Sequence, residues 1–162
     1  MTFNVHDFRT YIIGPTLELC ADLAGVPDTP YVRDLLVATC AQESRLGTWL
    51  HQTGSGPAIS IYQLEPATLD DLLRNFASAP KYRDILRASM VEGQPAVDQI
   101  IWNLRFATIC ARLNYYRVRE PLPRGTTFDS LWHYYKTYWN TRHGAATSAS
   151  FRDALKLTDI VV

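Results

Sequence analysis

The chain has 162 residues, of which 47% are hydrophobic and 20% are charged. This length and composition predict one globular domain, residues 1–162, that buries a core without needing disulfides or a structural metal. The 16 basic and 16 acidic residues give a formal net charge of zero, so no charge excess points to a nucleic-acid-binding or membrane-surface protein. We therefore expect no nucleic acid and no membrane among its partners.

The apolar pattern along the chain is helical and is interrupted by proline and glycine. Pro15 is predicted as the first residue of an early helix, and Gly25 at its end. Thr29 is predicted as the N-cap of the next helix, with Pro30 as its first residue. Apolar spacing then gives this second helix one buried face, made of Val32, Leu35, Leu36, Thr39 and Cys40.

Further helices are predicted at 65–76, 80–90, 94–118, 128–141 and 148–157. The segment 94–118 is apolar almost all round, which predicts one continuous, buried central helix. Extended structure is indicated only within 51–65, "HQTGSGPAISIYQLE", where apolar and polar residues alternate. The predicted fold class is mainly α, with a small loop or β-hairpin inserted after the second helix.

The cysteines and the N-terminus bear on where the chain folds. Cys20, Cys40 and Cys110 are odd in number and stand in apolar helical contexts, so we expect reduced core thiols of a protein folded in a cytoplasm. The first 15 residues place acidic and polar residues before a short apolar piece, unlike a signal peptide or a membrane span.

Glu43 ends the second predicted helix, on or beside its apolar face. Burial raises the pKa of a carboxyl group, and the negative end of the helix dipole acts in the same direction. An acid that stays protonated near neutral pH can protonate the leaving oxygen of a glycosidic bond. A solvated surface glutamate is the competing interpretation of the same position.

An ordered set of short motifs extends this interpretation. Glu43–Ser44 is followed by "SIYQ" at 60–63, by Pro-Ala-Thr at 66–68, and by Trp139–Asn140. This order resembles the Glu-Ser, Gly-Leu-Met-Gln, Pro-x-Thr and Ala-Tyr-Asn motifs of soluble lytic transglycosylases and goose-type lysozymes. "GPAISIYQLEPAT", "NLRFATICARLNYYR" and "YYKTYWNT" are also similar to patterns of bacteriophage lysozyme-like proteins. The resemblance covers residues 35 to 147.

The resemblance implies a lysozyme-like fold and cleavage of the β-1,4 bond between N-acetylmuramic acid and N-acetylglucosamine in peptidoglycan. Glu43 would be the catalytic acid, and Ser44 would orient it or the substrate. The implied substrate-binding residues are Ser44, Ser60, Tyr62, Gln63, Tyr135, Trp139 and Asn140. Gln63 is equally interpreted as a residue that fixes its loop. Glu65 is either a second catalytic carboxylate or an acid favoured at a helix start.

Two positions depart from the family pattern. Ser60 replaces the loop glycine, so we expect its backbone to avoid a glycine-only conformation. Trp139 replaces a tyrosine whose hydroxyl the family places near the acid; Tyr135 or Tyr138 would supply that hydroxyl instead.

No cofactor is expected, because the sequence has neither a glycine-rich phosphate loop nor a Gly-x-Ser-x-Gly motif. No metal is expected either, since His6, His51, His133 and His143 lack ligand spacing. The implied partner is the glycan strand of peptidoglycan. The chain would reach it either as a monomeric phage endolysin released to the wall or as a protein of the virion. The alternatives are an inactive lysozyme-like phage structural protein, or a chitin-directed hydrolase that uses Glu43 and Glu65 as an acid/base pair.

Overall fold

The computed structural model describes residues 2–141 and 144–162, which form helices around one continuous hydrophobic core. The α-helices are α1 (Val5–Asp7), α2 (Gly14–Ala24), α3 (Pro30–Ser44), α4 (Pro66–Asp71), α5 (Arg83–Ser89), α6 (Ala96–Trp102), α7 (Leu104–Tyr116), α8 (Phe128–Tyr135) and α9 (Ser148–Leu155). The π-helices η1 (Phe8–Ile13), η2 (Leu72–Phe76) and η4 (Lys136–Asn140) and the 3-10 helix η3 (Pro80–Tyr82) adjoin them. The predicted mainly α class is therefore confirmed.

The N-terminal helical run is longer than the sequence predicted. It extends from Val5 to Ala24, because α1, η1 and α2 follow one another without a break. Pro15 was predicted as the first residue of its helix, but it is the second residue of α2 and lies inside this run, just after the wider π-type turn of η1. Gly25 ends the run in the left-handed conformation, with φ of 61°.

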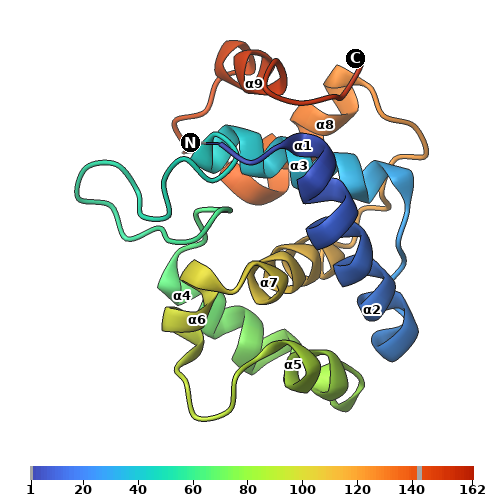
Figure 1. Ribbon diagram of the computed structural model, residues 1–162. Coiled ribbons are helices and arrows are strands. Elements are labelled where there is room, and N and C mark those ends of the chain that lie inside the picture. Colours follow the sequence, from blue (N-terminus) through green and yellow to red (C-terminus); the bar gives the residue numbers. More distant parts are fainter. Residues whose placement is uncertain (1, 142–143) are drawn as a thin grey trace.

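Helix α3 is central to the molecule. Thr29 caps it by accepting a hydrogen bond from the Val32 N–H over 3.2 Å, and Pro30 is its first residue, as predicted. The predicted buried face is confirmed, but α3 is also covered elsewhere, because it packs against η1, α7, α8 and α9. In Figure 1 it lies with α8 and α9 in the upper part of the molecule, while α4 to α7 lie below. The last residues of α3, Gln42, Glu43 and Ser44, are polar, and they belong to a helix that other helices surround.

The prediction of one continuous helix over 94–118 was wrong. Asn103 separates α6 from α7 with an extended backbone, at φ −89° and ψ 91°. Its side chain accepts from the Phe106 N–H over 3.0 Å and donates to the Ser89 carbonyl over 2.7 Å, so it caps α7 and ties it to α5. The apolar pattern did not reveal this break because both helices bury apolar residues in the same core.

The connection between α3 and α4 is a loop. Two isolated antiparallel bridges, His51–Ile59 and Ile59–Leu64, hold it, and the described residues contain no two-stranded hairpin. Residues 51–57 are exposed, while Ala58 to Tyr62 are buried, so the loop returns to the core before α4 begins.

The three cysteines are buried and unpaired, as predicted for thiols of the core. Across residues 2–141 and 144–162, no helix combines the length and apolar character needed to span a bilayer.

Candidate active site

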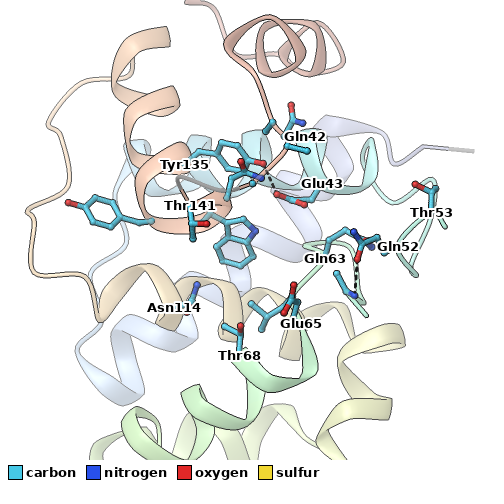
Figure 2. Close-up of a pocket in the computed structure, with 18 of the residues that line it drawn as sticks. Gln42, Glu43, Gln52, Thr53, Gln63, Glu65, Thr68, Asn114, Tyr135 and Thr141 are labelled. Atoms are coloured by element: carbon cyan, nitrogen blue, oxygen red, sulfur yellow. Dashed lines mark hydrogen bonds between the residues drawn. The ribbon is translucent and has the colours of Figure 1, made fainter. Parts of the chain in front are cut away.

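A cavity of about 780 Å³ lies beside the C-terminal end of α3. Its walls come from that helix end, the loop 49–65, the start of α4, the last turn of α7, and η4 with the segment after it (Figure 2). The volume lies within the usual range of ligand pockets, roughly 300–1,000 Å³.

The lining is rich in amides and aromatic rings and poor in charge. The amides are Gln42, Gln52, Gln63, Asn114 and Asn140, and the aromatic residues are Trp49, Tyr135, Tyr138 and Trp139. Glu43, Glu65 and Arg117 are the charged lining residues in the described part of the chain, and Arg117 is bonded to Asp71 at 2.6 Å. Such a surface suits an uncharged ligand that carries many hydroxyl and amide groups.

Glu43 is the next-to-last residue of α3 and is partly buried at the cavity wall. Burial raises the pKa of its carboxyl from 4.5 to about 7, and a hydrogen bond from Tyr135 opposes that rise. The Tyr135 hydroxyl donates to Oε1 over 2.7 Å. Because Oε1 already accepts the tyrosine proton, the neutral carboxyl carries its own proton on Oε2.

Tyr135 is the source of the hydroxyl that the sequence assigned to Tyr135 or Tyr138. Its ring is buried and stacks on Phe151 at 4.9 Å between centroids, which fixes the direction of the hydroxyl. The Tyr138 hydroxyl instead donates to the carboxylate of Glu120, away from Glu43. Both rings border the cavity, but they are bonded to different acids.

Ser44 is not placed to bind a substrate, and that prediction is corrected. It is completely buried and lies outside the cavity lining. Its hydroxyl donates to the carbonyls of Cys40 and Ile61, at 3.1 and 2.7 Å, and accepts from the Gly47 N–H at 2.9 Å. Ser44 therefore fastens the end of α3 to the 60–63 turn and places the neighbouring Glu43 through the backbone.

The 60–63 turn differs from the prediction in two ways. Ser60 has φ of 75°, so it adopts the left-handed conformation that its replacement of glycine was expected to exclude. Ser60 and Tyr62 are both buried and lie outside the cavity lining, so neither is placed to contact a ligand. Ser60 Oγ accepts from the Tyr62 N–H at 3.2 Å, and the Tyr62 hydroxyl is 3.3 Å from that of Thr108.

Gln63 lines the cavity and also fixes its own loop. Its Nε2 donates to the Ser60 carbonyl over 2.8 Å, which leaves its carbonyl oxygen for a ligand. Trp139 and Asn140 line the cavity as well, with Trp139 packed 5.1 Å from Tyr115 between ring centroids. The edge of a core aromatic cluster thus forms part of the cavity wall.

Glu65 lies in the same cavity, on a different wall from Glu43 (Figure 2). It is exposed and occupies the N-cap position of α4, directly before Pro66, without a side-chain capping bond. The structure therefore brings both predicted carboxylates to one cavity, one partly buried and bonded and the other exposed.

Left-handed backbone at residues other than glycine is concentrated around this site. In the described ranges these residues are Arg45, Leu46, Ser60, Gln63 and Thr141. Arg45 and Leu46 directly follow α3, where their N–H groups bond the carbonyls of Ala41 and Cys40 in a Schellman-type helix end. Of the five residues, Gln63 and Thr141 line the cavity, and strained backbone at such positions is a feature of functional sites.

Several lining residues were not among the predicted site residues. Trp49 donates from its indole N–H to the Glu43 carbonyl over 3.2 Å. Thr68 of α4 and Arg117 at the end of α7 also line the cavity. Asn114 is 7% exposed, and its Oδ1 has no hydrogen-bond partner; Oε1 of Gln42 also lacks one. Arg105, Thr108 and Arg112 stand in the same helix, so no sequence signal singled out Asn114.

Within the described residues, no group of three or more His, Cys, Asp and Glu side chains is arranged to hold a metal ion. His143, one of the four histidines considered, lies outside those residues. Comparison of the chain with protein-family models, curated protein sequences and solved structures returned no match.

Proposed function

We propose that this chain is a peptidoglycan-cleaving glycosidase with a lysozyme-like fold, acting on the β-1,4 bond between N-acetylmuramic acid and N-acetylglucosamine. One observation carries the proposal: the Glu43 carboxyl, with a pKa raised to about 7, borders a cavity lined by amides and aromatic rings. A neutral carboxyl can protonate a glycosidic oxygen, and such a lining suits sugar rings and N-acetyl groups. The motif resemblance selects peptidoglycan among the glycans.

In the proposed mechanism Glu43 acts first as an acid. Its Oε2 proton passes to the glycosidic oxygen as the bond from that oxygen to the anomeric carbon breaks, so the leaving sugar departs with a neutral hydroxyl. The negative charge that develops on Glu43 is stabilised by the hydrogen bond from Tyr135 to Oε1. The same carboxylate can then remove a proton from the group that attacks the anomeric carbon.

For that attacking group we propose the 6-hydroxyl of the muramic acid itself, which closes a 1,6-anhydro ring and needs no second carboxylate. The exposure of Glu65 and its position at the start of α4 support this choice, because they fit a helix-terminal acid. Its place in the same cavity favours a second candidate, a hydrolase of peptidoglycan or chitin in which Glu65 activates water.

The other alternative is a lysozyme-like structural protein of a phage particle that has lost activity. The two departures from the family pattern, Ser60 and Trp139, favour that alternative, Trp139 because it removes a family hydroxyl. The bond from Tyr135 to Glu43 supplies a hydroxyl to the acid from another position, so the tryptophan gives no reason to expect inactivity. We propose that the enzyme reaches the bacterial wall as a monomeric phage endolysin or within the virion.

The deciding experiment is digestion of purified peptidoglycan, with zymography and mass spectrometry of the fragments. We expect clearing by the wild-type protein and fragments that end in 1,6-anhydromuramic acid. Reducing muramic ends would identify a hydrolase. Absence of cleavage from about pH 5 to 8, where a carboxyl of raised pKa changes its protonation, would favour the structural protein.

A further inference from the structure

Lys136 binds three carbonyl oxygens with one ammonium group. Its Nζ donates to Asn140 Oδ1 at 2.7 Å, to the Gly144 carbonyl at 2.8 Å and to the Ala146 carbonyl at 3.0 Å. A lysine ammonium has three N–H donors, so these bonds use all of them. None of the ion pairs formed by the described residues involves Lys136. The ammonium therefore serves to hold neutral groups in place.

The Asn140 amide is the first of those groups, and its orientation is fixed on two sides. Because Lys136 holds Oδ1, the amide NH₂ is turned the other way, and the Asn140 side chain lowers the pKa of the Tyr135 hydroxyl, as a neighbouring N–H donor would. Gly144 packs against Asn140 so closely that a Cβ there would lie 2.3 Å from Oδ1. Any side chain at residue 144 would displace the Asn140 amide.

The Tyr135 hydroxyl has one proton and two neighbouring side chains that could accept it. Glu43 Oε1 accepts it now, over 2.7 Å. If the Asn140 amide were reversed, its Oδ1 would face the hydroxyl and compete for the same proton. An amide can reverse with little change of shape, so only its hydrogen-bond partners decide which end faces Tyr135.

We propose that Lys136 is a positioning residue for the Glu43 acid: by holding Asn140 Oδ1 it directs the Tyr135 proton to Glu43 Oε1 and leaves Oε2 to carry the transferable proton. This inference rests on the proposed function of Glu43. Lys136 lies outside the cavity lining and acts on Glu43 through Asn140 and Tyr135.

The groups that surround Glu43 allow its titration to be observed separately. In the described residues, the titratable side chains that face it are Tyr135 from α8, Tyr115 from α7 and Cys40 one turn earlier on α3. Burial raises the pKa of both tyrosines, and it raises that of Cys40 to about 12. The group in this set that changes charge near neutrality is Glu43 itself.

The test compares Lys136→Met with Lys156→Met, which removes an exposed lysine bonded only to Asp153. The kcat and KM of both variants are measured on soluble glycan fragments across the pH range. For Lys136→Met we expect kcat to fall about tenfold, and the alkaline limb to move up by about half a pH unit, because the carboxylate loses a donor. For Lys156→Met we expect wild-type values.

A second variant, Asn140→Leu, removes the intermediate amide and leaves Lys136 in place. We expect the alkaline limb of Asn140→Leu to stay where it is in the wild type. A double variant with Lys136→Met should show no shift either, because without Asn140 Oδ1 only Glu43 can accept the Tyr135 proton. A double variant whose alkaline limb is displaced as far as that of Lys136→Met alone would overturn the inference. Thermal melts identify any variant that has failed to fold, and Lys136→Leu replaces Lys136→Met in the comparison if the methionine variant fails.

The failure of this inference differs from the failure of the proposed function. A wild type that cleaves glycans, with Lys136→Met matching Lys156→Met in kcat and alkaline limb, would overturn the inference alone. A wild type that cleaves nothing would count against the function. In that case NMR titration of the Glu43 carboxyl carbon, without substrate, still tests whether Lys136→Met raises its pKa; an unchanged pKa would overturn the inference.

Discussion

Beside the Glu43 carboxyl, Tyr135 and Asn140 are held by hydrogen bonds to other side chains. On the α4–α7 wall of the same cavity Arg117 bonds Asp71, but Glu65 and Asn114 are not held in this way. Tyr135 bonds Glu43, and Lys136 bonds Asn140 beside it. Across the cavity, Glu65 is exposed without a capping bond, and Oδ1 of Asn114 has no partner although its residue is buried.

If the proposed function is right, this difference predicts different roles for the two walls. Groups already bonded to one another are preorganised, so they stabilise a charge that develops during reaction without first having to reorient. A buried polar atom without a partner is uncommon in folded proteins and is satisfied when a ligand supplies the missing group. Substitutions near Glu43 should therefore change kcat, and substitutions on the α4–α7 wall should change KM.

The largest effect is expected for Glu43→Gln. The amide keeps the shape of the side chain but cannot donate the proton, so cleavage should fall by about three orders of magnitude. Turbidity assays and thermal melts measure both properties, with Glu18→Gln on the exposed side of α2 as the control. A Glu43→Gln protein that melts normally and still clears cell walls would remove the acid from the mechanism.

The same substitution should stabilise the protein at alkaline pH. The folded pKa of about 7 lies above the ordinary value of 4.5, so ionisation of Glu43 opposes folding as the pH rises through this window. Below about pH 4 both states hold the proton, and no difference is expected. At about pH 8 Glu43→Gln should unfold with a free energy up to about 3 kcal/mol higher than the wild type. If the wild type and Glu43→Gln had equal denaturant midpoints at about pH 8 as well as below about pH 4, the raised pKa of Glu43 would be contradicted.

Tyr135→Phe should lower kcat by roughly 10- to 100-fold, because the developing carboxylate loses its donor. In the wild type, activity should decline as Glu43 loses its proton around its pKa of about 7. In the variant that alkaline limb should move to higher pH, since the bond from Tyr135 lowers the Glu43 pKa. Tyr138→Phe is the matched control, because its hydroxyl bonds Glu120. An equal loss in both variants would mean that the bond to Glu43 is unimportant.

Glu65→Gln should retain at least about a tenth of wild-type activity and still release 1,6-anhydro ends, because one acid suffices for that product. Fragment analysis by mass spectrometry, together with rates on whole peptidoglycan, tests this. If Glu65→Gln were inactive and the wild type released reducing ends, Glu65 would be a catalytic residue like Glu43, and the enzyme would be a two-carboxylate hydrolase.

The smallest effect is expected for Asn114→Leu, which keeps the volume but removes the polar atoms. We expect KM to rise about three- to fivefold with kcat unchanged, since one hydrogen bond to a ligand is worth about 1 kcal/mol. Asn75→Ala, on the exposed face of η2, is the control. If Asn114→Leu lowered kcat and left KM unchanged, the assignment of ligand binding to the α4–α7 wall and of catalysis to the Glu43 side would be wrong.

The sequence by itself determined the features that depend on neighbouring residues. The N-cap at Thr29, the end at Gly25, the buried face of α3 and the position of Glu43 at its C-terminal end were all predicted and are found. Capping and helical periodicity are set within a few residues, so they can be read from a short stretch of chain.

Only the tertiary structure decided which side chains meet in the cavity. Tyr135 bonds an acid 92 positions away, and Tyr138, three residues later, bonds another. Ser44 and Tyr62 are buried in the core, whereas Gln63 lines the cavity. Asn103 separates two helices where the apolar spacing predicted one. Each residue along a helix rotates the side-chain direction by about 100°, and left-handed residues in the loops change it abruptly. Which face of each element meets the cavity is therefore fixed by how the elements pack, and packing depends on contacts between distant parts of the chain.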